Sequence, residues 1–228
     1  MVGWVYRGAR EARALDRLVV ATDSEVILNY CKSERYDAVV TSSHHSSGTD
    51  RLVEVMEREA AEGCAADIYV NIQGDEPMVS AAHIDLLISG LRAPRGSTRA
   101  AQVSTLRVRT CPQAAADPNT VKVVADPRGW ALYFSRAQIP YRRDASCQAT
   151  YYKHLGFYAY TAAALRRFKT LAPSTLEKAE GLEQLRFLEN GIPVIVIETD
   201  QDTIGVDTEE DLSRVEEYFR RAGIVSSR

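Results

Sequence analysis

Residues 67–77 read Asp67-Ile-Tyr-Val-Asn-Ile-Gln-Gly-Asp-Glu-Pro77. The first half is rich in β-branched and aromatic residues, which predicts a short buried strand. The strand pattern ends abruptly at Gly74, so Asp75 is expected at the carboxyl end of a strand, where α/β sheets bind their ligands. Mg²⁺ binds through one or two protein carboxylates plus phosphate oxygens and water, which makes Asp75 a candidate metal ligand. A second reading stays open, in which Asp75 only caps the following helix.

The chain before this stretch alternates between strand and helix patterns. Strands are expected over Arg17–Thr22, Tyr36–Thr41 and Asp67–Ile72, and helices over Met1–Ala14, Ser24–Glu34 and Thr49–Glu62. Strands that alternate with helices at this spacing are typical of a doubly wound α/β fold with a mostly parallel sheet.

The second half has a less regular pattern. Strands that are close enough to form antiparallel pairs are expected over Gln102–Arg109, Thr120–Ala125 and Trp130–Phe134. The remaining expected elements are helices over Ala162–Thr170, Thr175–Asn190 and Thr208–Ala222 and a strand over Ile192–Glu198. No repeat or low-complexity linker divides the chain, so a single domain over residues 1–228 is expected.

Composition excludes several classes of protein. The chain has 228 residues, of which 45% are hydrophobic and 26% charged, as in ordinary globular proteins. A net charge of −3 gives no general reason to expect binding to nucleic acid or to a membrane surface. No apolar run approaches the roughly 20 residues that span a bilayer, and no secretory signal is evident, so a cytoplasmic protein is expected. The four cysteines lack the paired spacing of a zinc site, which favours structural thiols.

Seven short motifs occur together with this fold pattern. They are Ser47-Gly-Thr-Asp-Arg51, Asn71-Ile-Gln-Gly-Asp-Glu-Pro77, Val121-Lys-Val-Val124, Ala131-Leu-Tyr-Phe-Ser-Arg136, His154-Leu-Gly-Phe-Tyr158, Leu182-Glu-Gln-Leu-Arg186 and Gly205-Val-Asp-Thr208. In this order they resemble the 3-deoxy-manno-octulosonate cytidylyltransferases (CMP-Kdo synthetases), and the resemblance runs from Met1 to about Tyr218. It implies a nucleotide-diphospho-sugar transferase-like sheet. It also implies the reaction of CTP with the eight-carbon sugar acid Kdo, which gives CMP-Kdo and pyrophosphate for lipopolysaccharide synthesis.

The resemblance assigns roles around the metal and the nucleotide. It implies that Asp207 joins Asp75 in holding the catalytic Mg²⁺; the alternative for Asp207 is an N-cap of the last helix. The Ser47-Gly48-Thr49 turn with Arg51 resembles the loop that reads cytosine, because a small turn lets a base approach the backbone closely. Arg51 fits a surface ion pair equally well. Gln73 is expected to contact hydroxyls of the cytidine or of the sugar.

The resemblance also assigns the sugar pocket. Arg136 offers a fork of donors to the sugar carboxylate, and His154 and Tyr158 present polar tips. Glu183 and Gln184 are expected to bind sugar hydroxyls. The alternatives are a core histidine bonded to backbone for His154 and a solvated helix face for Glu183 and Gln184. Lys122 lies on an expected strand and has an even chance of facing the ligand.

One part of the family pattern has no match in this chain, and the resemblance also implies an oligomeric state. The strand and Gly-rich basic loop with which family members begin, and which embrace the triphosphate, have no match before Met1-Val-Gly-Trp4, so an N-terminally truncated fold is expected. Two explanations are open: a coding start placed too late, which we favour, or a chain that is short and inactive. We expect turnover only in a form extended by such a segment. A homodimer formed through an inserted antiparallel region, about residues 117–170, is also implied.

Three other functions remain open at this point. The chain fits a cytidylyltransferase for another acidic sugar, such as sialic acid or an amino-Kdo. It also fits a catalytically dead remnant that only binds the sugar. A glycosyltransferase of the same fold is the third, because a metal-binding aspartate at a strand end serves there too.

Overall fold

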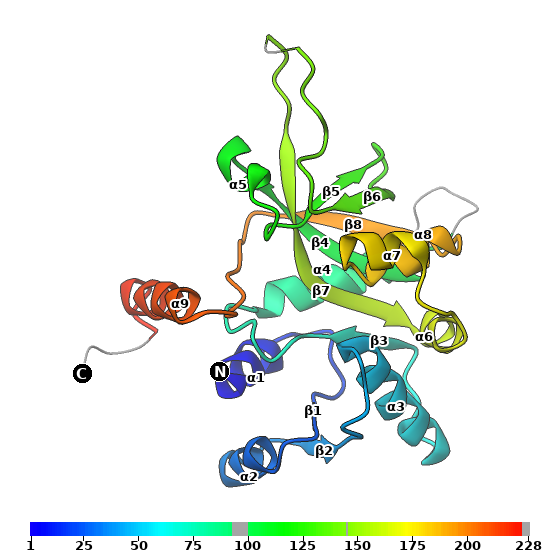
Figure 1. The fold of residues 1–228 in the computed structure, drawn as a ribbon. Coiled ribbons are helices and arrows are strands. Elements are labelled where there is room, and N and C mark those ends of the chain that lie inside the picture. Colours follow the sequence, from blue (N-terminus) through cyan, green and yellow to red (C-terminus); the bar gives the residue numbers. More distant parts are fainter. Residues whose placement is uncertain (93–99, 145, 225–228) are drawn as a thin grey trace.

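The computed structural model describes residues 1–92, 100–144 and 146–224 (Figure 1). The described strands are β1 (Val20–Thr22), β2 (Ala38–Val40), β3 (Ile68–Asn71), β4 (Val103–Thr110), β5 (Lys122–Ala125), β6 (Ala131–Ser135), β7 (Tyr151–Thr161) and β8 (Val194–Thr199). The described helices are α1 (Val2–Arg10), α2 (Glu25–Glu34), α3 (Gly48–Ala61), α4 (Ala81–Arg92), α5 (Pro112–Ala116), α6 (Ala162–Lys169), α7 (Thr175–Glu180), α8 (Gln184–Glu189) and α9 (Glu209–Arg221). The α/β fold class expected from the sequence is confirmed.

The strands form two sheets, of which the larger is mixed. β1 and β2 pair in parallel as a two-stranded sheet. The larger sheet has the order β6-β5-β7-β4-β8, and β3 pairs with β7. Within it β4 and β8 run parallel, whereas the pairs β3·β7, β4·β7, β5·β6 and β5·β7 are antiparallel. The antiparallel pairs expected in the second half are therefore present, and they involve the strand that precedes Asp75 as well.

β7 is the central strand of the larger sheet, and the sequence pattern did not reveal it. Its side chains are buried on both faces, so the strand has no polar face that would create an alternation. Its ladder with β4 is interrupted: Thr105 pairs with Tyr158, but the next residue, Leu106, pairs with Leu155. The bulge at Gly156 and Phe157 further hides the period of two.

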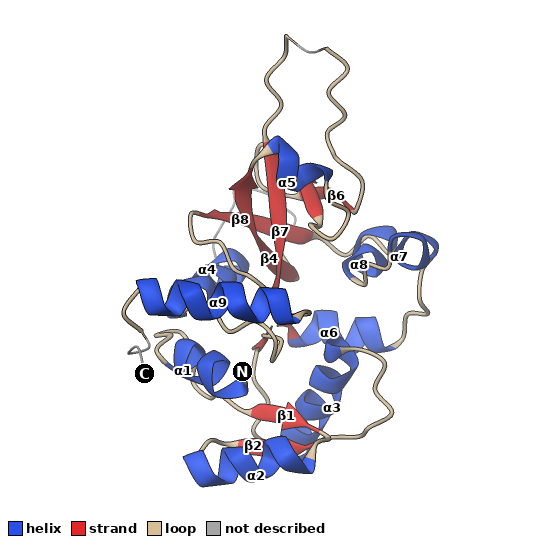
Figure 2. Cartoon of the chain, turned by 60° about the vertical axis from the view of Figure 1, so that its left-hand side comes forward, coloured by secondary structure: helices blue, strands red, loops and turns tan. Residues whose placement is uncertain are grey.

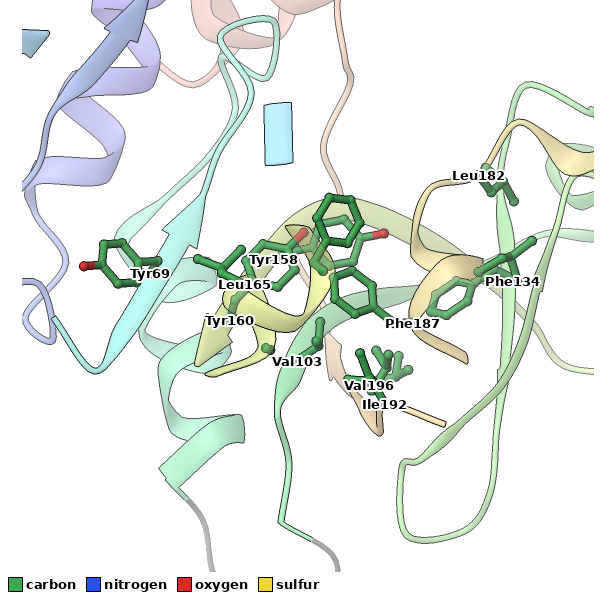
Figure 3. Close-up of a cluster of buried hydrophobic side chains, with 14 of the residues drawn as sticks. Tyr69, Val103, Phe134, Tyr158, Tyr160, Leu165, Leu182, Phe187, Ile192 and Val196 are labelled. Carbon is green, nitrogen blue, oxygen red and sulfur yellow. The ribbon is translucent and has the colours of Figure 1, made fainter. Parts of the chain in front are cut away.

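Two apolar clusters cover the two faces of this sheet. On one face the aromatic rings of Tyr158, Tyr160 and Phe187 pack with apolar residues of α6 and α8 (Figure 3). On the other face α1 and α4 cover Leu106, Leu155 and other residues of β4 and β7. The two clusters fix the rotation of β7, so that His154, Tyr158 and Tyr160 face the first cluster.

The segment predicted as one helix over Thr175–Asn190 is two helices. Gly181 ends α7 in the left-handed conformation, with φ of +63°, and α8 begins three residues later. Glycine reaches positive φ without the steric penalty that other residues have, which explains the break. After the break Leu182 is buried in the core, and the Glu183 carboxylate accepts from Thr49 of α3.

The last helix begins at a cap that differs from the expected one. Thr208 is the N-cap of α9 and forms a capping box with Asp211. α9 then lies beside α1, with the rings of Trp4 and Phe219 4.8 Å apart (Figure 2). Asp207 therefore precedes the N-cap residue and does not cap the helix.

Candidate active site

Asp75 and Asp207 lie close together at the end of β3. The main-chain N–H of Val206 donates to the carbonyl of Asp75 at 2.9 Å, which joins the two segments. Burial raises the pKa of Asp75, and the charge of Asp207 raises it further. The Oδ1 atom of Asp75 is buried and has no hydrogen-bond partner in the described part of the chain. α4 begins only at Ala81, so neither carboxylate is a helix cap, and both capping readings are wrong.

This arrangement fits a divalent cation. A buried carboxylate oxygen without a donor, beside a second carboxylate, is costly unless a cation or a proton neutralises it. Within the described ranges no group of three or more His, Cys, Asp or Glu side chains could hold a metal. A metal at Asp75 and Asp207 therefore needs further ligands from outside the protein, as Mg²⁺ bound to phosphates has.

Glu76 is a third carboxylate at this position, and the sequence analysis did not select it. Its Oε1 atom lies near Gly205 and Gly156: a Cβ built on either glycine would be 3.4 Å or 3.8 Å away. Burial, together with repulsion from Asp75, raises the pKa of Glu76 to about 7, and the charge of Lys153 opposes this. Gln73, which is exposed, lies at the same rim, with Nε2 4.0 Å from that Gly156 position.

The Ser47–Thr49 turn contacts Glu183 directly. Ser47 caps α3 by accepting a hydrogen bond from the N–H of Asp50, and the Thr49 hydroxyl donates to a carboxylate oxygen of Glu183. Burial raises the pKa of Glu183, and hydrogen bonds from Ser47 and Thr49 oppose the change. The predicted base-reading turn and the predicted sugar-binding glutamate are therefore neighbours.

His154 and Tyr158 lie on the same face of β7, next to this glutamate. Their rings are 5.4 Å apart, and the edge of His154 also packs against Phe134 at 5.0 Å. Burial lowers the pKa of His154 to about 3, so the imidazole is neutral at pH 7. The Tyr158 hydroxyl is buried without a hydrogen-bond partner in the described residues, and the nearby charge of Glu183 adds to the rise of its pKa caused by burial.

Arg136 is held through main-chain carbonyls. Its Nε donates to the carbonyl of Glu180 at 2.9 Å and its Nη1 to that of Pro118 at 3.2 Å. The Glu180 carboxylate accepts instead from the N–H of Arg136 and from the Ser135 hydroxyl. Among the described ion pairs none involves Arg136. Burial opposes ionisation of Glu180, but hydrogen bonds from Ser135 and Arg136, together with the Arg136 charge, lower its pKa.

Lys122 supports the main chain next to Arg136. Its side chain is fully buried, and Nζ donates to the carbonyls of Asp117 at 2.8 Å and Arg136 at 2.6 Å. Burial lowers the pKa of this ammonium. The open question of its direction is thus resolved: Lys122 points inward and supports Arg136.

Comparison with known proteins identifies the family. The family model of cytidylyltransferases matches residues 1–204. A 3-deoxy-manno-octulosonate cytidylyltransferase of Acidobacterium capsulatum is 50% identical over 96% of this chain and 85% of its own length. The chain belongs to the 3-deoxy-manno-octulosonate cytidylyltransferases. The corresponding enzyme of Koribacter versatilis is 48% identical over 96% of this chain and 80% of its own length.

Solved structures agree with this family. A CMP:2-keto-3-deoxy-manno-octonic acid synthetase, solved in complex with CTP, superposes with a TM-score of 0.88 at 39% identity, covering 97% of this chain and 88% of that one. A 4-diphosphocytidyl-2C-methyl-D-erythritol synthase of Anaerococcus prevotii, at 12% identity and a TM-score of 0.62, covers 96% of this chain and 86% of that one. The second likeness concerns the fold alone.

Contacts join several predicted residues of this cytidylyltransferase in groups, Asp75 with the Asp207 segment, Ser47 and Thr49 with Glu183, and His154 with Tyr158, while one predicted residue is engaged elsewhere. Gln184 begins α8 with a largely buried side chain, so the alternative of a solvated helix face is wrong for it. His154 is the buried histidine of the alternative reading, but its partner is the Thr105 hydroxyl at 2.9 Å. Arg51 is the exception: it pairs with Asp23 at 3.1 Å and bonds Thr41, which ties together the ends of β1 and β2.

Proposed function

We propose that this chain transfers CMP from CTP to the anomeric hydroxyl of 3-deoxy-manno-octulosonate, with release of pyrophosphate. The observation that carries the proposal is the Arg136 guanidinium. It lies beside the buried Lys122, and in the described part of the chain it donates to main-chain carbonyls alone, so a carboxylate of the substrate is its natural partner. Sugar acids carry that carboxylate, whereas neutral sugars do not.

Asp75 and Asp207 are the proposed Mg²⁺ ligands. Their proximity and the bare Oδ1 of Asp75 support this role. When bound, Mg²⁺ would neutralise charge on the triphosphate and on the departing pyrophosphate. The two aspartates thereby fix where the phosphates lie relative to the end of β3, with Gln73 at the rim beside them.

The sugar is proposed to lie between Arg136 and Glu183. Arg136 would hold its carboxylate at one end, and His154, Tyr158 and Gln184 would bind its hydroxyls. Glu183 links this pocket to the Ser47–Thr49 turn, where the cytosine and ribose of CTP are proposed to bind. Close approach of the base is supported by Gly48, where an added Cβ would already lie 3.4 Å from the Asn71 side chain.

A homodimer is a further part of the proposal. The segment between β6 and β7 projects from the body of the molecule (Figure 1), and Tyr141 on it is 85% exposed. Large exposed aromatic side chains on a projecting segment are typical of surfaces that pack against a partner. Residue 145 of the expected 117–170 region lies outside the described residues.

The test is release of pyrophosphate from CTP with Mg²⁺ and a panel of acidic sugars. This chain would be assayed beside a form extended by the family's N-terminal triphosphate-binding segment. We expect CMP-Kdo and pyrophosphate in equal amounts. A preference for sialic acid or an amino-Kdo would move the proposal to another acidic sugar, and sugar binding without turnover in either form would indicate a binding remnant.

A further inference from the structure

We infer that Thr105 is a positioning residue that holds His154 with its proton on Nε2, so that the bare Nδ1 accepts a hydrogen bond from a hydroxyl of the sugar acid. This inference rests on the proposed function for the identity of the ligand. The part that concerns Thr105 rests on contacts within the chain alone.

The proton positions follow from the contacts of the Thr105 hydroxyl. Its Oγ1 lies 2.8 Å from the carbonyl oxygen of Phe157, 3.2 Å from that of Leu155 and 2.9 Å from Nε2 of His154. Two oxygens 2.8 Å apart require a proton between them, and a carbonyl cannot supply it. Because the hydroxyl has one proton and donates it to a carbonyl, its lone pair must accept from Nε2–H.

The β7 bulge creates this arrangement. The register of β4 against β7 shifts between Thr105 and Leu106, which leaves Gly156 and Phe157 outside the ladder. The carbonyls of Leu155 and Phe157 both come within reach of one threonine hydroxyl as a result. Thr105 itself is fully buried, so water does not compete for these bonds.

The second ring nitrogen is left for a ligand. Nδ1 of His154 has no hydrogen bond within residues 1–92, 100–144 and 146–224, and it is not among their fully buried polar atoms without a partner. It therefore still reaches solvent. The ring lies against Tyr158, whose hydroxyl is near Glu183, and all three residues belong to the proposed sugar pocket.

The unprotonated Nδ1 of His154 determines which kind of ligand group can bind there. A bare nitrogen accepts a hydrogen bond, so the ligand must present a donor. A sugar hydroxyl can donate, whereas an ether or keto oxygen cannot. A site built to hydrogen-bond a hydroxyl discriminates strongly against analogues that lack it. We expect the analogue in which that hydroxyl is replaced by a methoxy group to bind about tenfold or more weakly.

The direct test is ¹⁵N NMR of the histidine side chains, with His154→Gln used to assign the signals. In the free protein at pH 7, Nε2 should show the shift of a protonated nitrogen and Nδ1 that of a bare one. Saturation with Kdo should move the Nδ1 signal toward that of a hydrogen-bonded acceptor. A proton on Nδ1 in the free protein would overturn the inference about Thr105, whatever the sugar does.

Variants separate positioning from simple loss of packing. Thr105→Val should mix the two tautomers of His154 and weaken Kdo binding about tenfold, and Thr105→Ser should restore both. The matched control is Ser104→Ala: Ser104 is the buried neighbour on the opposite face, where its hydroxyl donates to Leu87 at 2.6 Å. The Ser104→Ala variant should be less stable but should show unchanged His154 signals and unchanged Kdo affinity.

The remaining outcomes are also decisive. If Kdo binds but leaves Nδ1 unchanged, the acceptor role is wrong while the proposed function stands. If Kdo does not bind at all, the proposed function fails, whereas the tautomer in the free protein and its response to Thr105→Val still decide the role of Thr105.

Discussion

Within the described residues the Arg136 guanidinium donates to two main-chain carbonyls and to no carboxylate, and this feature sets the charge of the proposed sugar pocket. Lys122 and Glu180 fix the main chain of this residue: the Lys122 ammonium donates to the Arg136 carbonyl, and the Glu180 carboxylate accepts from the Arg136 N–H. The sequence motif could suggest Arg136 as a carboxylate ligand. It could not reveal Lys122 and Glu180 as supports, because these contacts join residues up to 44 positions apart.

Removing the Arg136 charge should affect the sugar and spare the nucleotide. Arg136→Met is expected to weaken Kdo binding about 10- to 100-fold, since charge-assisted hydrogen bonds are lost, and to leave CTP affinity unchanged. Isothermal titration calorimetry measures both. Arg167→Met is the control, because that guanidinium also donates to a main-chain carbonyl, at Asn190, but on the exposed side of α6. Equal Kdo affinity in Arg136→Met would contradict the proposed pocket.

Asp207 and Asp211 provide a matched pair for the metal. Asp207→Asn should lower kcat about 100-fold and raise the Mg²⁺ concentration needed for half-maximal rate, because a charged ligand is lost. Asp211→Asn removes a partner of the Thr208 capping box and should lower stability without changing the Mg²⁺ dependence. Initial rates over a Mg²⁺ titration in the form that turns over provide the measurement. The same Mg²⁺ curve for both variants would argue against a metal at Asp207.

At the scale of helices and strands, some sequence signals were sufficient to predict the observed element and others were not. Helices with a clear apolar stripe and a cap, such as α3 and α9, begin within one residue of the expected position. β7 was missed because burial on both faces and the bulge at Gly156 remove its alternation. The broken helix at Gly181 was missed because one glycine within a helical pattern is also compatible with a continuous helix.

His83 couples two elements and makes stability depend on pH. Its Nδ1 accepts from the N–H of Ser80 at the start of α4, and its Nε2–H donates to the carbonyl of Gln201 after β8. Burial lowers the pKa of His83 below its ordinary value of 6.5. As pH falls below about 6.5 the unfolded chain therefore binds the proton first, and the free energy of unfolding decreases.

The predicted slope is measurable by urea unfolding between pH 7.5 and pH 5. Relative to His83→Gln, the wild-type protein should lose up to about 1.4 kcal/mol per pH unit below pH 6.5. His154 contributes a slope of the same sign to both proteins, so only the difference between them reports on His83. His44→Gln, which replaces an exposed histidine, is the control. Parallel pH profiles for wild type and His83→Gln would rule out the coupling.

At the scale of the whole molecule, part of the segment between β6 and β7 projects from the body (Figure 1), and Tyr141 on it is exposed. We expect the protein to sediment as a dimer, and replacement of residues 141–149 by a short Gly/Ser linker should give a monomer that stays folded. Val26→Ser, which alters a similarly exposed apolar side chain on α2, should remain dimeric. Analytical ultracentrifugation decides, and a dimer that survives the replacement would show that another surface forms it.

The contacts between distant segments explain which site residues could be predicted from the sequence and which could not. The resemblance placed Asp75 and Asp207 in one site although 132 positions separate them, and the two segments do meet, through the Val206 to Asp75 hydrogen bond. Glu76 and Thr105 went unnoticed. Their environments depend on Gly156, Gly205 and the β7 bulge, which only the folded chain brings together.

The most direct measurement for this account is a crystal structure of the extended form with CTP, Kdo and Mn²⁺ in place of Mg²⁺, phased to locate the manganese. We predict an anomalous peak within coordination distance of both Asp75 and Asp207, with the Kdo carboxylate on Arg136. Manganese bound to neither aspartate, or a sugar carboxylate far from Arg136, would contradict it.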